Sequence, residues 1–223
     1  MDRKVGIFGG TFNPIHFGHL RAAEEVREKL NLAKILFIPS CNPPLKDSDL
    51  AAAEYRYEMV RASVGANPFF EISDIECRLL GKSYTVETVR ALQELSPEDT
   101  FSLILGIDSF LDIPAWYQPD VLLGMTDFVV ISRPGFRFSG LSAMIAAEAP
   151  LLNELDEGRL EMHKARMRSG REAVLLNITP LNISATAVRR LVSEGRSIKY
   201  LLPESVESYI ISNNLYRERG DYL

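Results

Sequence analysis

The sequence contains few cysteines and no long apolar segment. Only two of its 223 residues are cysteine, Cys41 and Cys77, and they do not form a CxxC pair. We therefore expect two reduced thiols in a cytoplasmic protein, and no disulfide framework. The longest apolar runs, such as Phe128–Ile131 and Val174–Leu176, are far too short to cross a bilayer. The first residues lack the apolar core of a secretory signal, so we expect no membrane association.

The chain also lacks an excess of basic residues. Its 25 Lys and Arg residues and 30 Asp and Glu residues give a net charge of −5, and the two signs are interspersed. Broad nucleic-acid binding needs a basic face that neutralises phosphates, so we expect no nucleic-acid partner. A local pocket could still hold a small anionic substrate. The hydrophobic share of 46% is that of an ordinary globular protein.

Three common motifs are absent. The early glycines fall at positions that the dinucleotide-binding GxGxxG motif does not allow, namely Gly6, Gly9, Gly10 and Gly18. Gly81-Lys82-Ser83 resembles the end of a P-loop, but Glu76 stands where a P-loop needs its first glycine. There is no HExxH, and the third histidine, His163, lies far along the chain from the other two. A protein-held metal site is therefore not indicated.

Apolar runs of strand length alternate with amphipathic stretches of helix length. The predicted strands are Val5–Phe8, Ile35–Ile38, Phe69–Ile75, Phe101–Leu105, Phe128–Ile131 and Ala173–Leu176. The predicted helices are His19–Leu30, Glu54–Val64, Val86–Leu95 and Pro203–Asn213. Nearly continuous apolar strands are typical of parallel strands that are covered on both faces. The pattern predicts an α/β fold with a doubly wound, mostly parallel sheet, which binds ligands at the carboxyl ends of its strands.

We interpret residues 1–223 as a single domain. Residues 134–171 are the least regular part, because they mix glycine, a short helix-like stretch and a run of charges. This composition favours a solvated insertion on the surface. Residues 184–223 are expected to form a small helical part at the C-terminus, with a proline near the first turn of the last helix.

The most specific motif follows the first predicted strand and reads Gly9-Gly10-Thr11-Phe12-Asn13-Pro14-Ile15-His16-Phe17-Gly18-His19. Paired glycines let a backbone turn approach a ligand closely, because they have no Cβ. The helix that follows begins with unpaired N–H groups and a positive dipole end, which favour phosphate. Two imidazoles at this position can donate hydrogen bonds to phosphate oxygens as negative charge develops. Together these features predict a phosphate site, although each alone also fits a tight turn or a helix cap.

A second motif, Ile183-Ser184-Ala185-Thr186-Ala187-Val188-Arg189, opens a predicted helix near the C-terminus. Ser184 is a favourable N-cap residue, and the Thr186 hydroxyl lies in the first turn, where free amides can also meet phosphate. Arg189 follows about one turn later, within reach of phosphate oxygens. By itself, the segment is more typical of a capped surface helix with an ordinary arginine.

Together, the two motifs resemble the HxGH and ISxTxxR signatures of the nucleotidylyltransferase superfamily. Within it, the chain is similar to the bacterial nicotinate-mononucleotide adenylyltransferases over nearly its whole length. Further matches are Asn42–Lys46, Ser83–Thr85, Gly106–Asp108, Pro114–Tyr117, Arg133–Gly135, Leu201–Pro203, Tyr209-Ile210 and Leu215-Tyr216. Two positions depart from the family pattern: Leu45 replaces a frequent histidine, and Ala185 replaces a frequent serine.

The resemblance implies a Rossmann-like nucleotidyltransferase fold and transfer of the adenylyl group of ATP to nicotinate mononucleotide. The products would be nicotinate adenine dinucleotide, a precursor in NAD biosynthesis, and pyrophosphate. The implied catalytic residues are His16, His19 and Arg189. The implied ATP-binding residues are Gly9, Gly10, Thr11, Phe12, Asp108, Ile183, Ser184 and Thr186. The implied acceptor-binding residues are Lys46, Tyr84, Thr85 and Trp116.

For this reaction we expect Mg²⁺ as cofactor, bound through the ATP phosphates with most of its waters retained. Several alternatives remain open at this point: nicotinamide mononucleotide or another phosphate acceptor in the same chemistry, and a regulator that binds ATP without catalysis. Only Lys82 accompanies Ser83–Thr85 as a basic residue, so selection of the acid would depend on backbone N–H groups. The oligomeric state also remains open.

Overall fold

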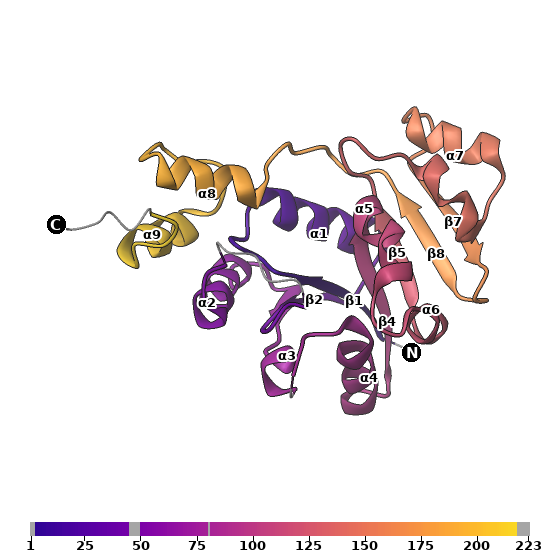
Figure 1. Cartoon of the computed structure of the whole chain (residues 1–223). Helices are drawn as coiled ribbons and strands as arrows, with labels where there is room; N and C mark the ends of the chain where they lie inside the picture. The colour runs from indigo at the N-terminus through magenta and orange to yellow at the C-terminus, as the bar shows by residue number, and fades with distance from the viewer. Residues whose placement is uncertain (1–2, 45–49, 80, 218–223) are drawn as a thin grey trace.

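The computed structural model describes residues 3–44, 50–79 and 81–217. Its centre is an eight-stranded sheet with the order β3-β2-β1-β4-β5-β8-β7-β6 (Figure 1). The strands are β1 Arg3–Gly10, β2 Lys34–Pro39, β3 Phe70–Ile72, β4 Asp99–Gly106, β5 Asp127–Ile131, β6 Ile145–Ala146, β7 Met162–Met167 and β8 Glu172–Leu176. The six strands β3, β2, β1, β4, β5 and β8 pair in parallel, and β7 pairs antiparallel with both β8 and β6. The predicted mostly parallel sheet is confirmed.

Helices cover both faces of the sheet, with α1 on one side of the central strands and α3 and α4 on the other (Figure 1). The α-helices are α1 Phe17–Leu30, α2 Ala53–Val64, α3 Ile75–Arg78, α4 Thr85–Leu95, α5 Ile107–Leu111, α6 Pro119–Met125, α7 Ala149–Asp156, α8 Ala185–Ser193 and α9 Glu204–Ser212. Two short 3-10 helices are η1 Ile113–Ala115 and η2 Phe138–Ala143. Among the described residues, no helix has the length and apolar character needed to cross a membrane.

The central strands are buried on both faces. In β4, Leu103 and Leu105 belong to the core on the α4 side, where Val89 also packs. The residue between them, Ile104, belongs to the core on the α1 side, together with Val26. Because successive strand residues point to opposite faces, burial of both faces requires the continuous apolar runs seen in the sequence.

The strand order defines where a ligand is expected. The chain passes from β1 outward to β2 and β3, and then crosses back to place β4 on the other side of β1. Ile7 of β1 pairs in register with Leu36 of β2 and with Leu103 of β4. The carboxyl ends of the three strands therefore meet at one edge, and the gap between the connections that leave β1 and β4 is the switch point of the sheet.

The interpretation of residues 134–171 as a solvated insertion is wrong. This segment contains η2, β6, α7 and β7, and β7 extends the sheet by pairing with β8. Leu141 and Leu152 are fully buried, and Ala165 and Met167 of β7 are 3% exposed. In β7 the charged residues alternate with these apolar ones, so the sequence shows a run of charges although one face of the strand is core.

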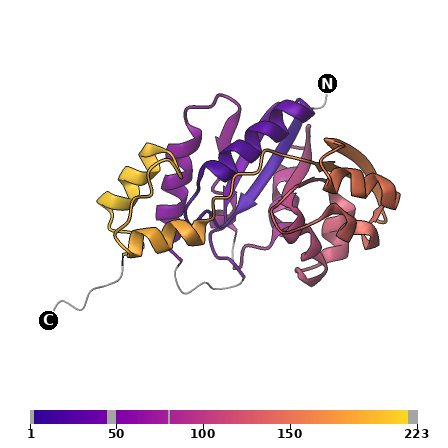
Figure 2. The same cartoon turned by 90° about the horizontal axis from the view of Figure 1, so that it is seen from above.

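The C-terminal helical part packs against α2. Ser205 at the start of α9 donates a hydrogen bond to the Ala62 carbonyl of α2, 3.1 Å away. Val206 and Ile210 are buried in the same core as Met59 of α2. Figure 2 shows α8 and α9 at the end of the molecule where α2 lies, away from β7. This packing places the start of α8 near the edge of the sheet where β1 ends.

Cys41 and Cys77 form a disulfide, so the prediction of two reduced thiols is wrong. Their Cα atoms are 5.0 Å apart, although 36 positions separate them in the sequence. Cys41 follows β2 and Cys77 lies in α3, which follows β3. The parallel pairing of β2 with β3 brings these two segments together. Sequence spacing carries no sign of this proximity, because it depends on which strands are neighbours.

Gly6 of β1 lies in a part of the core with no room for a side chain. A Cβ there would lie 2.7 Å from Ile104 Cδ1, 2.8 Å from Ile35 Cδ1 and 3.0 Å from Leu32 Cδ1. Overpacking of this kind costs about 1–3 kcal/mol, so we expect Gly6→Ala to lower the free energy of unfolding in urea by that amount. The control is Gly124→Ala in α6, where a Cβ meets nothing within 4 Å. Equal stability of the two variants would contradict the tight packing at Gly6.

Candidate active site

The turn after β1 lies at the switch point. A Cβ on Gly9 would meet nothing within 4 Å, whereas one on Gly10 would lie 3.2 Å from the Phe12 ring. Phe12 has a φ of 47°, in the left-handed region that non-glycine residues rarely adopt. Its ring packs edge-on against His19, with 5.2 Å between the ring centroids, and near Phe37 at 5.9 Å. Aromatic packing thus holds an unusual backbone shape next to open space, as is common at ligand sites.

His16 and His19 form a stacked pair at the start of α1. Their ring centroids are 3.7 Å apart, with 25° between the planes. The His16 backbone N–H donates to Nδ1 of His19 at 3.3 Å. Since Nδ1 of His19 accepts this bond, its proton lies on Nε2, and the Nε2–H group is the donor that His19 can offer to a ligand.

Burial keeps both imidazoles neutral. Loss of solvent, with a smaller effect of the Arg133 charge, lowers the pKa of His16 to about 4. Burial, followed by the neighbouring His16 and then Arg133, lowers the pKa of His19 well below its usual value. Within the described residues, the buried Nδ1 of His16 has no hydrogen-bond partner. The pair can therefore donate to a phosphate without carrying charge in the free protein.

Steric constraints explain why position 18, the glycine of the HxGH motif, has no side chain. A Cβ on Gly18 would lie 3.0 Å from both Cε1 and Nδ1 of the His16 ring, and 3.7 Å from the Ile183 carbonyl oxygen. Only a residue without a side chain lets His16 lie flat against the first turn of α1. The same contact shows that Ile183, which precedes α8, approaches this turn closely.

The ISxTxxR segment forms the predicted capped helix start. Ser184 is the N-cap of α8, and its hydroxyl accepts the backbone N–H of Ala187 at 3.2 Å. Thr186 lies in the first turn and is exposed. Arg189 reaches back to the turn after β1, where its Nη1 donates to the Asn13 carbonyl oxygen at 2.9 Å. Two helix N-terminal regions, those of α1 and α8, thus lie beside the same turn.

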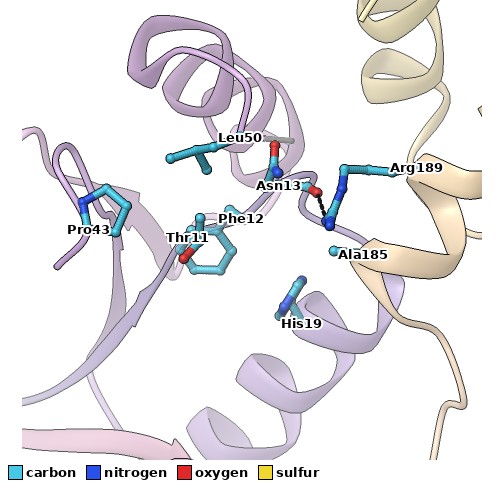
Figure 3. Close-up of a pocket in the computed structure, with 8 residues that line it drawn as sticks. All are labelled: Thr11, Phe12, Asn13, His19, Pro43, Leu50, Ala185 and Arg189. Carbon is cyan, nitrogen blue, oxygen red and sulfur yellow. Dashed lines mark hydrogen bonds between the residues drawn. The ribbon is translucent and has the colours of Figure 1, made fainter. Parts of the chain in front are cut away.

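Residues from both motifs line a cavity of about 210 Å³, although His16, Ser184 and Thr186 are not among them. Figure 3 shows His19 on α1 and Arg189 on α8 beside the turn that carries Thr11 and Phe12. The lining residues are Thr11, Phe12, Asn13, His19, Pro43, Leu50, Ala185 and Arg189. The volume is below the roughly 300–1,000 Å³ that encloses a drug-sized ligand, so the cavity fits part of a nucleotide, such as its phosphates.

Asp108 lies beyond this cavity, just after β4. Its Oδ2 pairs with Nε of Arg133 at 3.1 Å, and a Cβ on Gly106 would collide with its Oδ1. Gly106 therefore lets the carboxylate fold back over the end of β4. Sequence reasoning did not select Arg133 as a site residue. It lies two residues after the end of β5, and its charge contributes to lowering the pKa of both His16 and His19.

The predicted acceptor residues that the structure describes, Tyr84, Thr85 and Trp116, do not line the cavity. Thr85 is the first residue of α4, and Tyr84 precedes it. The Tyr84 ring stacks on Tyr117 with 4.4 Å between centroids, and Trp116 is half-buried against the core. Tyr117, which is 47% exposed, was not selected from the sequence. Lys46, and Leu45 before it, lie outside the described residues.

Sequence reasoning also missed the role of Asn13. Besides accepting from Arg189 through its backbone, it is buried, and its side-chain Oδ1 accepts the Ala51 N–H at 3.2 Å and the Tyr216 hydroxyl at 2.8 Å. Asn13 therefore connects the turn to the segment before α2 and to the end of the described chain. Its place between the glycines and the histidines was the only signal available.

A doubly wound sheet with a turn of this kind at its switch point defines a nucleotide-binding α/β protein. The sequence model of the cytidylyltransferase-like family matches residues 7–191. The chain belongs to this family and, within it, to the bacterial nicotinate-nucleotide adenylyltransferases.

Curated relatives match almost the whole length of the chain. A protein of Geotalea uraniireducens, named probable nicotinate-nucleotide adenylyltransferase, is 41% identical over 96% of this chain and 99% of its own. The Geobacter sulfurreducens protein of the same name is 43% identical over 97% of this chain and 100% of its own.

Solved structures share the fold at lower sequence identity. The Plasmodium falciparum nicotinic acid mononucleotide adenylyltransferase complexed with NaAD has a TM-score of 0.73 at 21% identity, covering 96% of this chain and 97% of that chain. A putative nicotinate-nucleotide adenylyltransferase from Vibrio parahaemolyticus has a TM-score of 0.65 at 17% identity, covering 97% and 96% of the two chains.

The low pKa of His16 predicts a loss of stability in mild acid. The folded-state value of about 4 lies below the 6.5 of an unperturbed histidine. The stability due to the neutral ring is therefore fully present above about pH 6.5 and is lost as the pH falls toward about 4. Between about pH 7.5 and 5, we expect wild type to lose about 2 kcal/mol more unfolding free energy than His16→Asn. Urea denaturation at both pH values checks this, and equal losses would contradict it.

Proposed function

We propose that this chain transfers the adenylyl group of ATP to nicotinate mononucleotide, forming nicotinate adenine dinucleotide and pyrophosphate in NAD biosynthesis. The observation that carries the proposal is the placement of the His16–His19 pair and Arg189 around one turn at the switch point of the sheet. The names of relatives about 41–43% identical over almost the whole chain support it. A cytoplasmic location is part of the proposal, since ATP is available there.

The reaction is a single displacement. An oxygen of the nicotinate-mononucleotide phosphate attacks the α-phosphorus of ATP, and the bond from this phosphorus to the β-phosphate bridging oxygen breaks. Pyrophosphate leaves with the electron pair of that bond. The attacking phosphate is already ionised at neutral pH, so neither a general base nor a covalent intermediate is required. Catalysis then depends on alignment and on stabilisation of the charge that develops.

Three kinds of donor are available for the ATP phosphates. At the start of α1, the Phe17 and His19 N–H groups already donate to the Leu201 and His16 carbonyl oxygens, at 3.0 Å each. The donors offered to the phosphates are therefore the Gly18 N–H of α1 and the Ala185 and Thr186 N–H groups of α8, since helix N-termini favour anions. Gly9 and Gly10 let the turn approach the phosphates. The His19 Nε2–H donates as negative charge develops on the leaving group. Arg189 supplies a permanent positive charge from α8, whereas His19 lies on α1. The Asp108 carboxylate is placed after β4 to accept hydrogen bonds from ribose hydroxyls.

The start of α4 is the proposed site for the nicotinate ring. The first N–H groups of a helix have no partner within the helix, and those of α4 begin at Thr85, beside the Tyr84–Tyr117 stack. An aromatic ring can pack on Trp116, while the carboxylate of the acid form meets these N–H groups. The amide form offers no negative charge to them, so the helix start favours the acid.

Mg²⁺ is also part of the proposal. Within the described residues, no group of three or more His, Cys, Asp or Glu side chains is placed to hold a metal ion. We therefore propose that the ion takes its ligands from the ATP phosphates and from water, as Mg²⁺ commonly does. When bound, the ion neutralises charge on the phosphates; the Asp108 carboxylate and the donors around the turn orient the nucleotide that carries it.

Replacement of His19 tests the charge-stabilising role. Loss of one such donor costs about 2.7–4 kcal/mol in the transition state, so we expect His19→Ala to lower kcat by on the order of a hundredfold or more. His163→Ala is the matched control, because His163 lies on β7 at the far end of the sheet. A decrease of less than threefold in His19→Ala, with an unchanged circular dichroism spectrum, would remove His19 from catalysis.

The proposed function is tested by pyrophosphate release from ATP and Mg²⁺, with nicotinate mononucleotide and nicotinamide mononucleotide compared side by side. We expect a strong preference in kcat/KM for the acid. Preference for the amide would agree with adenylyl transfer but would contradict nicotinate mononucleotide as the acceptor. No release with either would overturn the proposed function and direct attention to other phosphate acceptors, or to ATP binding without catalysis.

A further inference from the structure

Arg56 of α2 is a charged side chain without an evident place in the proposed chemistry. It is 1% exposed and is among the largest fully buried side chains. In the part of the chain that the structure describes, no carboxylate oxygen lies within 4 Å of its guanidinium. A buried charge is costly unless its donors are satisfied, so the groups that satisfy Arg56 are informative.

The partners of Arg56 are backbone carbonyl oxygens from three segments. Nη1 donates to Thr11 in the turn after β1 at 2.9 Å, and also to Ser40. Nη2 donates to Cys41 at 3.3 Å, and Nε donates to Ala51 at 2.9 Å. One rigid, planar guanidinium therefore binds the turn of the proposed ATP site, the segment after β2, and Ala51 before α2.

These bonds determine where the neighbouring N–H groups point. In a trans peptide, the C=O and the following N–H point in opposite directions. Carbonyls that face Arg56 therefore turn the N–H groups of Phe12 and Asn42 away from it. For Asn42 the structure shows the result: its N–H donates to the Ser83 hydroxyl at 3.0 Å, and the Ser83 N–H donates to the Asn42 carbonyl at 2.9 Å. Ser83 directly precedes Tyr84 and α4.

We infer that Arg56 is a positioning residue that couples ATP binding to acceptor binding, by fixing the Thr11 and Ser40–Cys41 backbones in one orientation. The coupling passes from the turn after β1 through Arg56 to Cys41, and from Asn42 to Ser83 and the start of α4. A substrate that orders one end of this path lowers the cost of ordering the other. The inference rests on the proposed function, because the two ends are the proposed ATP and nicotinate-mononucleotide sites.

Lysine at position 56 separates this role from the presence of a buried charge. Arg56→Lys keeps the charge, but an ammonium is a point donor that cannot reproduce the planar fork. The matched control is Arg61→Lys, on the exposed side of the same helix, where Arg61 pairs with Glu58. A change in overall stability does not by itself alter the coupling between two ligands, so that coupling is the quantity to measure.

The experiment is calorimetric titration of the full chain with Mg²⁺ and α,β-methylene ATP, which cannot transfer its adenylyl group. The dissociation constant is measured with and without saturating nicotinate mononucleotide. In wild type and Arg61→Lys, we expect the mononucleotide to tighten analogue binding about fivefold or more. In Arg56→Lys, we expect this ratio to fall below about twofold. A wild-type ratio of one, or a wild-type ratio preserved in Arg56→Lys, would overturn the inference.

A second variant covers the case in which Arg56→Lys does not fold. Ser83→Ala removes the hydroxyl that accepts the Asn42 N–H and leaves Arg56 unchanged, and it is expected to reduce the ratio as well. If the ratio of dissociation constants in Ser83→Ala equals that of wild type, the proposed path from Arg56 through Asn42 to Ser83 is overturned. Failure of the proposed function would give a different result. Wild type would then bind the ATP analogue but show no heat of binding for nicotinate mononucleotide. That result would overturn both the proposed function and the coupling inference.

Discussion

Two arginine side chains hold the turn between β1 and α1 by its carbonyl oxygens. Arg56 reaches Thr11 from α2, and Arg189 reaches Asn13 from α8, each at 2.9 Å. The backbone direction of the turn is thus set by charges on two separate helices. This turn then determines where α1 begins and where the first N–H groups of α1 point. The proposed phosphate site, the histidine pair and the approach of α8 all depend on this short segment.

The histidines illustrate how the fold sets the chemistry. Gly18 leaves room for the His16 ring, the ring stacks on His19, and the His16 N–H leaves only Nε2 of His19 to donate. Burial lowers the pKa of both rings, so neither adds positive charge to the free site. The permanent charge comes from Arg189 and Arg133. Such a site is prepared for an anionic ligand without requiring a protonated histidine.

Much of the fold followed from the sequence, because parallel strands covered on both faces need continuous apolar runs. The β7 region was misjudged, since alternation of charged and apolar residues hid its buried face. The pairing of Cys41 with Cys77 depends on which strands are neighbours, which composition cannot reveal.

The HxGH and ISxTxxR segments were found because their residue types and spacing are rare in combination. Arg56 left no such signal, since an arginine in an amphipathic helix is usually exposed, and its partners are backbone atoms. Arg133 and Tyr117 lay within matched segments, but only the structure shows them beside Asp108 and Tyr84. A side chain that binds backbone atoms, or that contacts a residue distant in the sequence, leaves no pattern by which its role can be predicted from the sequence.

The proposed direct transfer of the adenylyl group, without a protein-bound intermediate, is tested most sharply by stereochemistry. One diastereomer of adenosine α-thiotriphosphate is reacted with nicotinate mononucleotide, and the configuration at phosphorus in the dinucleotide product is determined by phosphorus NMR. A single displacement within the aligned site predicts inversion. Retention would contradict it, because two displacements would then be required, with a neutral imidazole such as that of His16 or His19 as the intermediate nucleophile.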